Sequence, residues 1–260
     1  MSIHSADLLG AELQEILQSW NPSTFYEYRS MHLAKDTLLE RMSSAPWFGA
    51  LDLHEQKVLL CEATPLHFGP GEFVFRQGDR ADGFYAVVEG AVKGSTLLEN
   101  GKEAILGVLE PGTWFGEASI IDGLPRSHDV TALKSSNVLR VGSDVFTELM
   151  HRNSFARSIA RLQAARMRSL YELIEDALLR STRARVARQL HRLARAEATA
   201  SGSGHVVAIT QEMLAMMLGI TRQTLALELK EMVARGILSI EYGRIRISSM
   251  EALRGLEQTT

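Results

Sequence analysis

The period of the hydrophobic positions changes along the chain, first to a strand pattern and then to a helical one. Between Leu66 and Val141, short segments rich in Val, Ile, Phe and Tyr are separated by turns containing Gly, Pro or Asp. Strands at this regular spacing predict an antiparallel barrel or roll. The Asn100-Gly101 pair predicts a hairpin turn within it. The expected strands include Glu72–Phe75, Phe84–Val88, Ala91–Leu97, Ile105–Leu109, Val130–Leu133 and Val138–Val141.

A helical pattern begins near Ser143, where Ser143 or Asp144 is expected to cap a short helix over Val145–Met150. A long helix is predicted over residues 154–179, and its apolar stripe requires a partner, either the roll or a second copy of the chain. Arg166 interrupts the stripe, which argues against a self-standing coiled coil. The stripe contains Phe155, Ile159, Leu162, Leu170, Leu173, Ile174, Ala177 and Leu178.

Two further helical segments lie at the ends of this region. A basic helix is predicted from Thr182 to about Ala196, followed by a small-residue loop over Ala198–Gly204. Near the N-terminus, leucines and Ile16 at helical spacing predict an accessory helix that ends at Asn21-Pro22. A short helix over Thr37–Met42 follows it.

The segment Thr210–Arg235 predicts two helices joined by a tight turn. Gly219 supplies the turn and Thr221 caps the second helix. A buried face is formed by Leu214, Leu218, Ile220, Leu225, Leu229 and Met232, which leaves Arg222, Gln223, Ala226, Leu227 and Lys230 pointing away. A hairpin follows, with strands over Ile237–Glu241 and Arg244–Ile247 joined by Tyr242-Gly243. The pattern is typical of a winged helix-turn-helix, and the alternative is a plain helical hairpin inside a core.

Charge is distributed unevenly along the 260 residues, although the net charge is only −3. Residues 1–179 contain 16 Lys and Arg against 24 Asp and Glu, whereas residues 180–255 contain 12 against 6. A basic C-terminal third on an acidic protein favours nucleic-acid binding. The alternative is that these basic residues form only the solvated faces of helices.

Composition excludes several classes of protein. No apolar run reaches the roughly 20 residues that span a bilayer, so we expect a cytoplasmic protein without a membrane partner. The single cysteine, Cys61, excludes an internal disulfide and four-cysteine metal sites. The eight histidines show no HxH or HExxH spacing, so no metal is expected. No nucleophile elbow, Walker loop or paired-carboxylate motif is present, which argues against an enzyme.

The segment Trp114–Ala132, WFGEASIIDGLPRSHDVTA, resembles the phosphate-binding cassette of cyclic-nucleotide-binding domains. The upstream stretch PGEFVFRQGDRADGFYAVVEGAV resembles the first strands of the same domain. Together with the helix-turn-helix, these motifs make the chain resemble the Crp/Fnr family of transcription regulators. The resemblance implies a ligand site formed by Gly116, Glu117, Ala118, Arg126 and Ser127.

Each of these residues has a role that suits a cyclic nucleotide. Gly116 lets the backbone approach the ligand, and the helix start at Ala118 offers free N–H groups to an anion. Arg126 pairs with the phosphate and Ser127 adds a hydroxyl donor. The resemblance implies that Glu117 accepts a bond from the ribose 2′-OH. The alternative is a β-hairpin in which Arg126 only forms an ion pair with Glu117.

The chain departs from the family pattern at the end of the site that reads the base. His128 stands where the family usually has a small residue. Leu170 and Tyr171 align with hydroxyl-bearing residues that contact the base, although Ser169 and Tyr171 lie near enough to substitute. We therefore include Tyr171 in the ligand site. The ligand could be a cyclic nucleotide other than cAMP, or the protein could bind no nucleotide. Haem sensing through Cys61 and His67 has little support.

The resemblance also assigns DNA-reading roles to the second helix of the helix-turn-helix. Arg222 is expected to bind guanine O6 and N7, and Gln223 to bind adenine N6 and N7. Leu227 replaces a residue that is often arginine in the family and is expected to contact a thymine methyl. The other expected DNA contacts are Thr221, Lys230, Arg244 and Arg246, with phosphates as the targets on the wing.

These features predict an α+β protein with a β-roll sensor, a long dimerisation helix and a winged helix-turn-helix. The expected boundaries are 1–36 for the accessory segment, 37–152 for the sensor, 153–180 for the long helix and 181–255 for the DNA-binding domain. We expect a homodimer that binds palindromic double-stranded DNA, responds to cAMP or a related cyclic nucleotide, contacts RNA polymerase and acts as an activator. The alternatives are a ligand-independent regulator of the same type and a nucleotide-gated module that controls an enzyme.

Overall fold

The computed structural model describes Leu38 and residues 41–43, 45–97, 99, 103–201 and 205–257. The expected accessory segment, most of the Thr37–Met42 helix and the Asn100-Gly101 turn lie outside these residues. The chain divides into two compact units: the first ends at Ala164, and the second begins at Ala165 and also contains Leu97–Leu106. Within the described ranges, no helix is long and apolar enough to cross a membrane.

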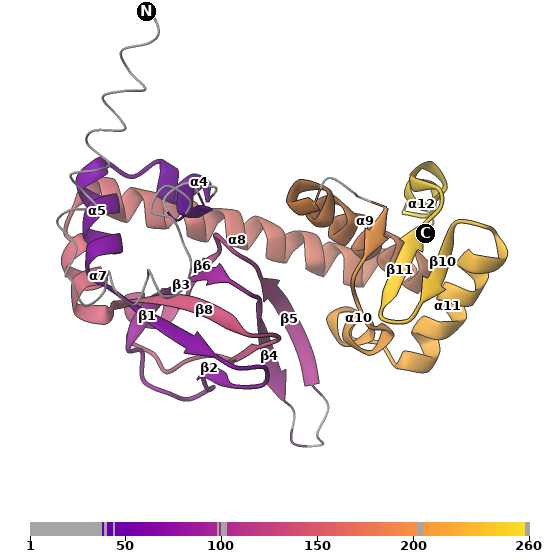
Figure 1. The fold of residues 1–260 in the computed structure, drawn as a ribbon, viewed down its shortest axis with the longest axis horizontal. Coiled ribbons are helices and arrows are strands. Elements are labelled where there is room, and N and C mark those ends of the chain that lie inside the picture. Colours follow the sequence, from indigo (N-terminus) through magenta and orange to yellow (C-terminus); the bar gives the residue numbers. More distant parts are fainter. Residues whose placement is uncertain are drawn as a thin grey trace, which may run out of the picture. The chain divides into compact units, whose positions relative to one another are not determined.

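The first unit contains a β-roll made of two four-stranded antiparallel sheets (Figure 1), which confirms the predicted roll. One sheet has the order β1-β8-β3-β6 and the other has the order β2-β7-β4-β5. The two-residue strand β6 and much of the six-residue strand β1 were not predicted. The strands are β1 Ala63–Phe68, β2 Phe73–Phe75, β3 Gly83–Glu89, β4 Val92–Leu97, β5 Glu103–Leu109, β6 Trp114–Phe115, β7 Asp129–Ala132 and β8 Ser136–Gly142.

Strand β3 is buried on both faces, and its alternating side chains enter two different cores. Phe84, Ala86 and Val88 face a helical layer, whereas Tyr85 and Val87 face the interior of the roll. Because successive side chains of a strand point to opposite faces, a strand between two cores has no polar position. The roll interior also contains Phe75, Val92, Phe115, Val130, Ala132 and Val138.

The helical layer of the first unit contains α4 Pro46–Gly49, α5 Leu53–Cys61, α7 Ser143–Met150 and the start of α8, Asn153–Leu179. The pattern did not predict α5, which begins with a capping box between Asp52 and Glu55. The expected cap of α7 by Ser143 or Asp144 is wrong. Gly142 occupies the N-cap position there, without a side-chain hydrogen bond. The long helix α8 matches the predicted 154–179 helix within one residue.

The second unit contains the winged helix-turn-helix. It comprises α9 Thr182–Ser201, β9 Val206–Val207, α10 Gln211–Leu218, α11 Arg222–Ala234, β10 Leu238–Glu241, β11 Arg244–Ile247 and α12 Met250–Leu256. One apolar cluster joins these elements, so the alternative of a helical hairpin without a wing is wrong. Helix α9 continues past Ala198 to Ser201, where a loop was expected. The strand β9 adds a third strand to the wing, and neither β9 nor α12 was predicted.

Candidate functional site

The expected phosphate-binding residues lie together in a turn and a short helix of the first unit. Gly116 follows β6 with a φ of 92°, a conformation that side-chain-bearing residues rarely adopt. A Cβ atom at Gly116 would lie 3.0 Å from Arg126 Nη1, so glycine is also needed for the close approach. Glu117 then occupies the N-cap position of α6, Ala118–Ile121.

Arg126 is only 2% exposed, and its guanidinium points into the protein. Nη1 donates to the Gly116 carbonyl at 2.5 Å, while Nη2 donates to the Gly83 carbonyl at 2.8 Å and to Asp82 Oδ1 at 3.0 Å. The guanidinium carbon lies 4.2 Å from the centre of the Phe75 ring. The buried Nε has no hydrogen-bond partner among the described residues. The guanidinium is therefore preorganised by the protein and retains one unfilled donor.

Asp82 is held as an anion beside Arg126. Partial burial opposes the charge, but hydrogen bonds from the Tyr85 hydroxyl and from Arg126 outweigh it and lower the pKa of Asp82. The Tyr85 hydroxyl donates to both carboxylate oxygens, at 2.8 and 2.7 Å. Burial, followed by the bond to Asp82, raises the pKa of Tyr85, so it stays protonated as a donor. Neither residue was predicted from the sequence, although both lie in the upstream stretch that carried the resemblance.

Glu117 is almost fully buried, at 1% exposure. Its Oε1 atom accepts a hydrogen bond of 2.5 Å from Gln163 Nε2, which lies on the first half of α8. The acid that pairs with Arg126 is Asp82, so the alternative of an Arg126–Glu117 ion pair is not what the structure shows. Helix α8 thus contacts the cassette through Gln163, a residue that no motif had indicated.

Ser127 and His128 complete this part of the cassette. Ser127 is exposed, and its Oγ atom lies 2.9 Å from Nδ1 of His128. The last expected ligand residue, Tyr171, belongs to the second unit and is 62% exposed. The structure therefore brings five of the six expected ligand residues together in one unit.

Both helices of the helix-turn-helix begin with the threonine caps that their sequence favours. Thr210 accepts a hydrogen bond from the Met213 backbone, and Thr221 accepts one from the Thr224 backbone. Gly219 ends α10 in the left-handed conformation, with a φ of 64°. Leu225, Leu229 and Met232 are buried, which fixes the rotation of α11 about its axis.

The rotation of α11 exposes the residues that were expected to read DNA. Arg222, Gln223 and Lys230 are all exposed, and Leu227 is 70% exposed. On the inner side, Arg183 of α9 forms ion pairs with Glu228 and Glu231. This face of α11 therefore presents three polar side chains and one apolar side chain to a partner, a combination that could bind base edges and a thymine methyl.

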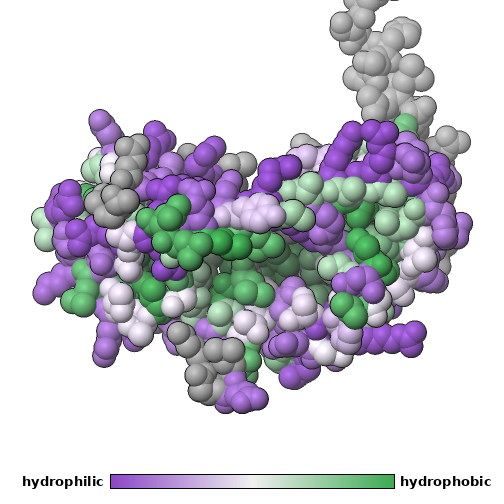
Figure 2. All heavy atoms as spheres, turned by 180° about the vertical axis from the view of Figure 1, so that it is seen from behind, coloured by the Kyte–Doolittle hydropathy of each residue, from purple (hydrophilic) through white to green (hydrophobic). Residues whose placement is uncertain are grey.

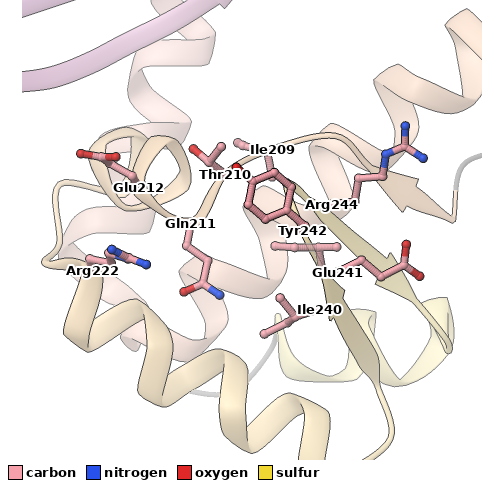
Figure 3. Close-up of a pocket in the computed structure, with 11 residues that line it drawn as sticks. Ile209, Thr210, Gln211, Glu212, Arg222, Ile240, Glu241, Tyr242 and Arg244 are labelled. Carbon is pink, nitrogen blue, oxygen red and sulfur yellow. The ribbon is translucent and has the colours of Figure 1, made fainter.

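A cavity of about 320 Å³ separates the start of α11 from the wing. Its lining includes Gln211, Arg222, Tyr242 and Arg244, and Figure 3 shows Arg222 extending towards Gln211 while Arg244 extends outward from the wing. Tyr242 is fully exposed at the tip of the wing hairpin. Tyr242 was predicted only as a turn residue, although a bulky aromatic in a two-residue turn could have indicated a contact.

The second half of α8 exposes a stripe of large apolar side chains. Between Met167 and Leu179 every residue except Asp176 is exposed. Apolar atoms form a band along the face that α8 occupies (Figure 2). The stripe comprises Met167, Leu170, Tyr171, Leu173, Ile174, Leu178 and Leu179, which are between 40% and 77% exposed.

Comparisons with known proteins agree with both halves of this description. Residues 65–153 match the model of the cyclic nucleotide-binding domain, and residues 184–256 match that of the Crp-like helix-turn-helix domain. A CRP-like cAMP-activated global transcriptional regulator of Mycobacterium tuberculosis is 28% identical over 82% of this chain and 97% of its own length. The chain belongs to the Crp/Fnr family of transcription regulators.

Further similarities extend over most of this Crp/Fnr-family chain. The cyclic AMP receptor protein of Thermus thermophilus is 27% identical over 79% of the chain and 94% of its own length. The structure of FixK2 from Bradyrhizobium japonicum aligns with this chain at a TM-score of 0.68 and 23% sequence identity. The alignment covers 76% of this chain and 98% of FixK2, and it supports the fold. The chain is thus a transcription regulator, not an enzyme, with a cyclic-nucleotide-binding domain and a DNA-binding domain.

Proposed function

We propose that this Crp/Fnr-family regulator binds a 3′,5′-cyclic nucleotide and, as a homodimer, binds palindromic DNA in a ligand-dependent manner. The proposed ligand residues are Gly116, Glu117, Ala118, Arg126, Ser127 and Tyr171. The proposed DNA contacts are Thr221, Arg222, Gln223, Leu227, Lys230 and Arg244. Bound at a promoter in the cytoplasm, the dimer would contact RNA polymerase.

The observation that carries the ligand proposal is the buried guanidinium of Arg126. A buried N–H donor without a partner costs free energy, and Nε of Arg126 is such a donor. A cyclic phosphate offers anionic acceptor oxygens, and the φ of Gly116 brings backbone close to the same place. The relatives named for activation by cAMP support the same ligand class.

The exposed stripe on α8 supports a second copy of the chain as its partner. Met167, Leu170 and Ile174 follow the three- and four-residue spacing of a helix-pair seam. A symmetric pair would also present two α11 helices, as a palindromic site requires.

A calorimetric titration of the full chain with cAMP and cGMP tests the ligand proposal. We expect saturable binding at one site per chain, and tighter binding of a palindromic DNA duplex once the nucleotide is present. If no heat of binding is measured up to millimolar nucleotide, the ligand proposal is contradicted.

Arg126→Ala and Glu117→Ala locate the site. Arg126→Ala should weaken nucleotide binding by orders of magnitude, because removing one partner of a buried ion pair typically costs about 3–5 kcal/mol. Glu117→Ala should weaken it less, because Glu117 is proposed to hold a neutral hydroxyl. Unchanged affinity in Arg126→Ala, with a normal unfolding curve, would place the ligand elsewhere.

One observation favours a second candidate, a regulator that is active without a ligand. Asp82 and two carbonyls already accept from Arg126, and Gln163 donates to Glu117. Internal hydrogen-bond partners of this kind can satisfy the polar groups that a bound nucleotide would otherwise satisfy. High-affinity DNA binding in the absence of any nucleotide, unaffected by Arg126→Ala, would support this candidate.

A further inference from the structure

His128 lies on the inner face of the roll, next to the proposed phosphate contacts. It directly precedes β7, in which Val130 and Ala132 enter the core between the two sheets. The ring of His128 neighbours that of Phe75, which belongs to the same core as Val130, so His128 points to the same side as Val130. Asp129 points to the other side, where its carboxylate accepts a hydrogen bond of 2.7 Å from the Gln77 backbone.

Neighbouring residues hold the His128 ring in a defined place. Gly94 on β4 pairs with Val130, and a Cβ atom on Gly94 would lie 3.4 Å from His128 Cδ2. The ring of Phe75, which also stacks on Arg126, lies 6.4 Å from the imidazole, measured between ring centres. His128 and Arg126 therefore flank the same phenylalanine.

The hydrogen bond between Ser127 and His128 can take two forms. If Ser127 donates to Nδ1, its only proton is used and cannot reach a phosphate. If Nδ1 carries the hydrogen and donates to Oγ, the Ser127 hydroxyl keeps its proton for another acceptor. An anionic phosphate beside Arg126 accepts hydrogen bonds and so favours the second form, in which the Ser127 hydroxyl is available as a donor.

We propose that His128 is a positioning residue for the ligand phosphate, which acts by donating from Nδ1 to Ser127 Oγ and so directing the serine hydroxyl hydrogen towards the phosphate. The inference rests on the proposed function, since it needs a cyclic nucleotide at the cassette. It explains why an imidazole stands beside Ser127 at a position where a small residue would leave the hydroxyl free to rotate.

A double-mutant cycle with cAMP and cGMP as probes tests whether His128 acts through Ser127. Calorimetry would compare the wild type, Ser127→Ala, His128→Ala and the double variant. A hydrogen bond to an anion predicts a loss on the order of tenfold for Ser127→Ala, and a similar or smaller loss for His128→Ala. The double variant should lose no more than Ser127→Ala alone, because both changes remove the same interaction.

Two further variants separate positioning from packing. His128→Asn retains an N–H donor near the place of Nδ1 and should recover most of the affinity. His67→Ala is the matched control, because His67 is also paired with a serine, Ser135 at 3.5 Å, but on the exposed side of β1. Thermal unfolding of each variant checks the fold, and His128→Leu, which fills space without an N–H donor, replaces His128→Ala in the cycle if that variant unfolds.

The outcomes distinguish this inference from the function on which it rests. If losses in the double variant multiply, or if His128→Ala binds like the wild type, the inference is overturned. If the wild type binds neither nucleotide, the proposed function fails and the inference fails with it. Binding that Arg126→Ala abolishes while His128→Ala leaves unchanged overturns the inference alone.

Discussion

Single carboxylates fix the side chains of two arginines that lie near the proposed ligand and DNA contacts. Asp82 holds Arg126 within the sensor, and Glu241 holds Arg246 on the wing at 3.0 Å. Arg222 and Arg244, by contrast, line the open cavity between α11 and the wing. An arginine that an acid already binds is fixed in place and keeps only its remaining donors for a ligand, as Arg126 keeps Nε. An arginine beside an open cavity can instead reach a phosphate or a base with its whole guanidinium.

Asp82→Asn should lower the stability of the sensor at neutral pH. The pKa of Asp82 is lowered in the folded state, so its stabilisation is present at pH 7 and is lost as the pH falls below about 4. Because the carboxylate is about half exposed, we expect a loss of about 1 kcal/mol rather than the larger value for a buried pair. Urea unfolding between pH 3 and 8 measures it, with exposed Glu110→Gln as the control. A difference that persists unchanged at pH 3 would contradict this assignment.

Arg222 and Arg244 should differ in what they contribute to DNA binding. Arg222→Ala should cost about 1–3 kcal/mol and relax the preference at one base pair of each half-site. Arg244→Ala should weaken binding to all sequences alike and reduce the salt slope by roughly one unit per subunit. Arg246→Ala is the matched control and should change less, because Glu241 already binds Arg246. A binding-site selection with salt titrations measures all three, and an unchanged consensus in Arg222→Ala would mean that α11 is rotated differently against DNA.

At the scale of elements, the sequence predicted the helices and strands whose hydrophobic pattern is long enough to repeat, together with those that a local motif marks. The stripe of α8 and the Thr221 cap of α11 are local signals, and both were confirmed. The strands β6 and β9 have two residues each, too few for alternation to appear. Alanine is the strongest helix former, which explains why α9 extends through the Ala198 region where small residues had suggested a loop.

In the candidate ligand site, the sequence likewise did not reveal contacts between residues that are far apart in the chain. Motif spacing located Arg126 and Glu117, but their partners lie far away in the sequence, Asp82 at a separation of 44 residues and Gln163 at 46. Only the pairing of the strands and the packing of α8 bring such residues together. The proposed ligand positions could thus be identified from the sequence, whereas the residues that orient them could not.

Asp176 connects α8 with α9 and provides a test of how elements are held together. Its carboxylate, only 7% exposed, forms ion pairs with Arg180, Arg188 and Arg192 at 2.8, 3.1 and 3.1 Å. Asp176→Asn removes the anion that the three guanidinium groups share. We expect a loss of about 2 kcal/mol in the free energy of unfolding, because water partly screens the arginines. Glu175→Gln is the control and should change stability by less than about 0.5 kcal/mol, since Glu175 is 59% exposed and 3.9 Å from Arg180. Equal losses in the two variants, measured by urea unfolding, would contradict this role.

At the scale of the whole molecule, the exposed stripe on α8 is the strongest reason to expect a second chain. Fully burying one large aliphatic side chain contributes roughly 1.5–3 kcal/mol, and the stripe presents seven large apolar residues in the single chain. A soluble protein rarely leaves so many neighbouring apolar residues exposed, unless another surface covers them. A dimer through this stripe would bring two copies of α11 to one DNA duplex, about 34 Å apart for successive major grooves.

Replacing Leu170 and Ile174 together with Asp should therefore give monomers. Each change would bury a carboxylate in an apolar seam, which costs several kcal/mol unless the chains separate. Analytical ultracentrifugation at micromolar concentration measures the assembly, and fluorescence anisotropy with a palindromic duplex measures the loss of DNA binding. Ala165→Asp with Ser169→Asp is the matched control, because it places two acids at the same four-residue spacing on exposed positions turned away from the stripe. A wild type that sediments as a monomer, or a Leu170→Asp, Ile174→Asp variant that remains dimeric, would show that the chains do not associate through α8.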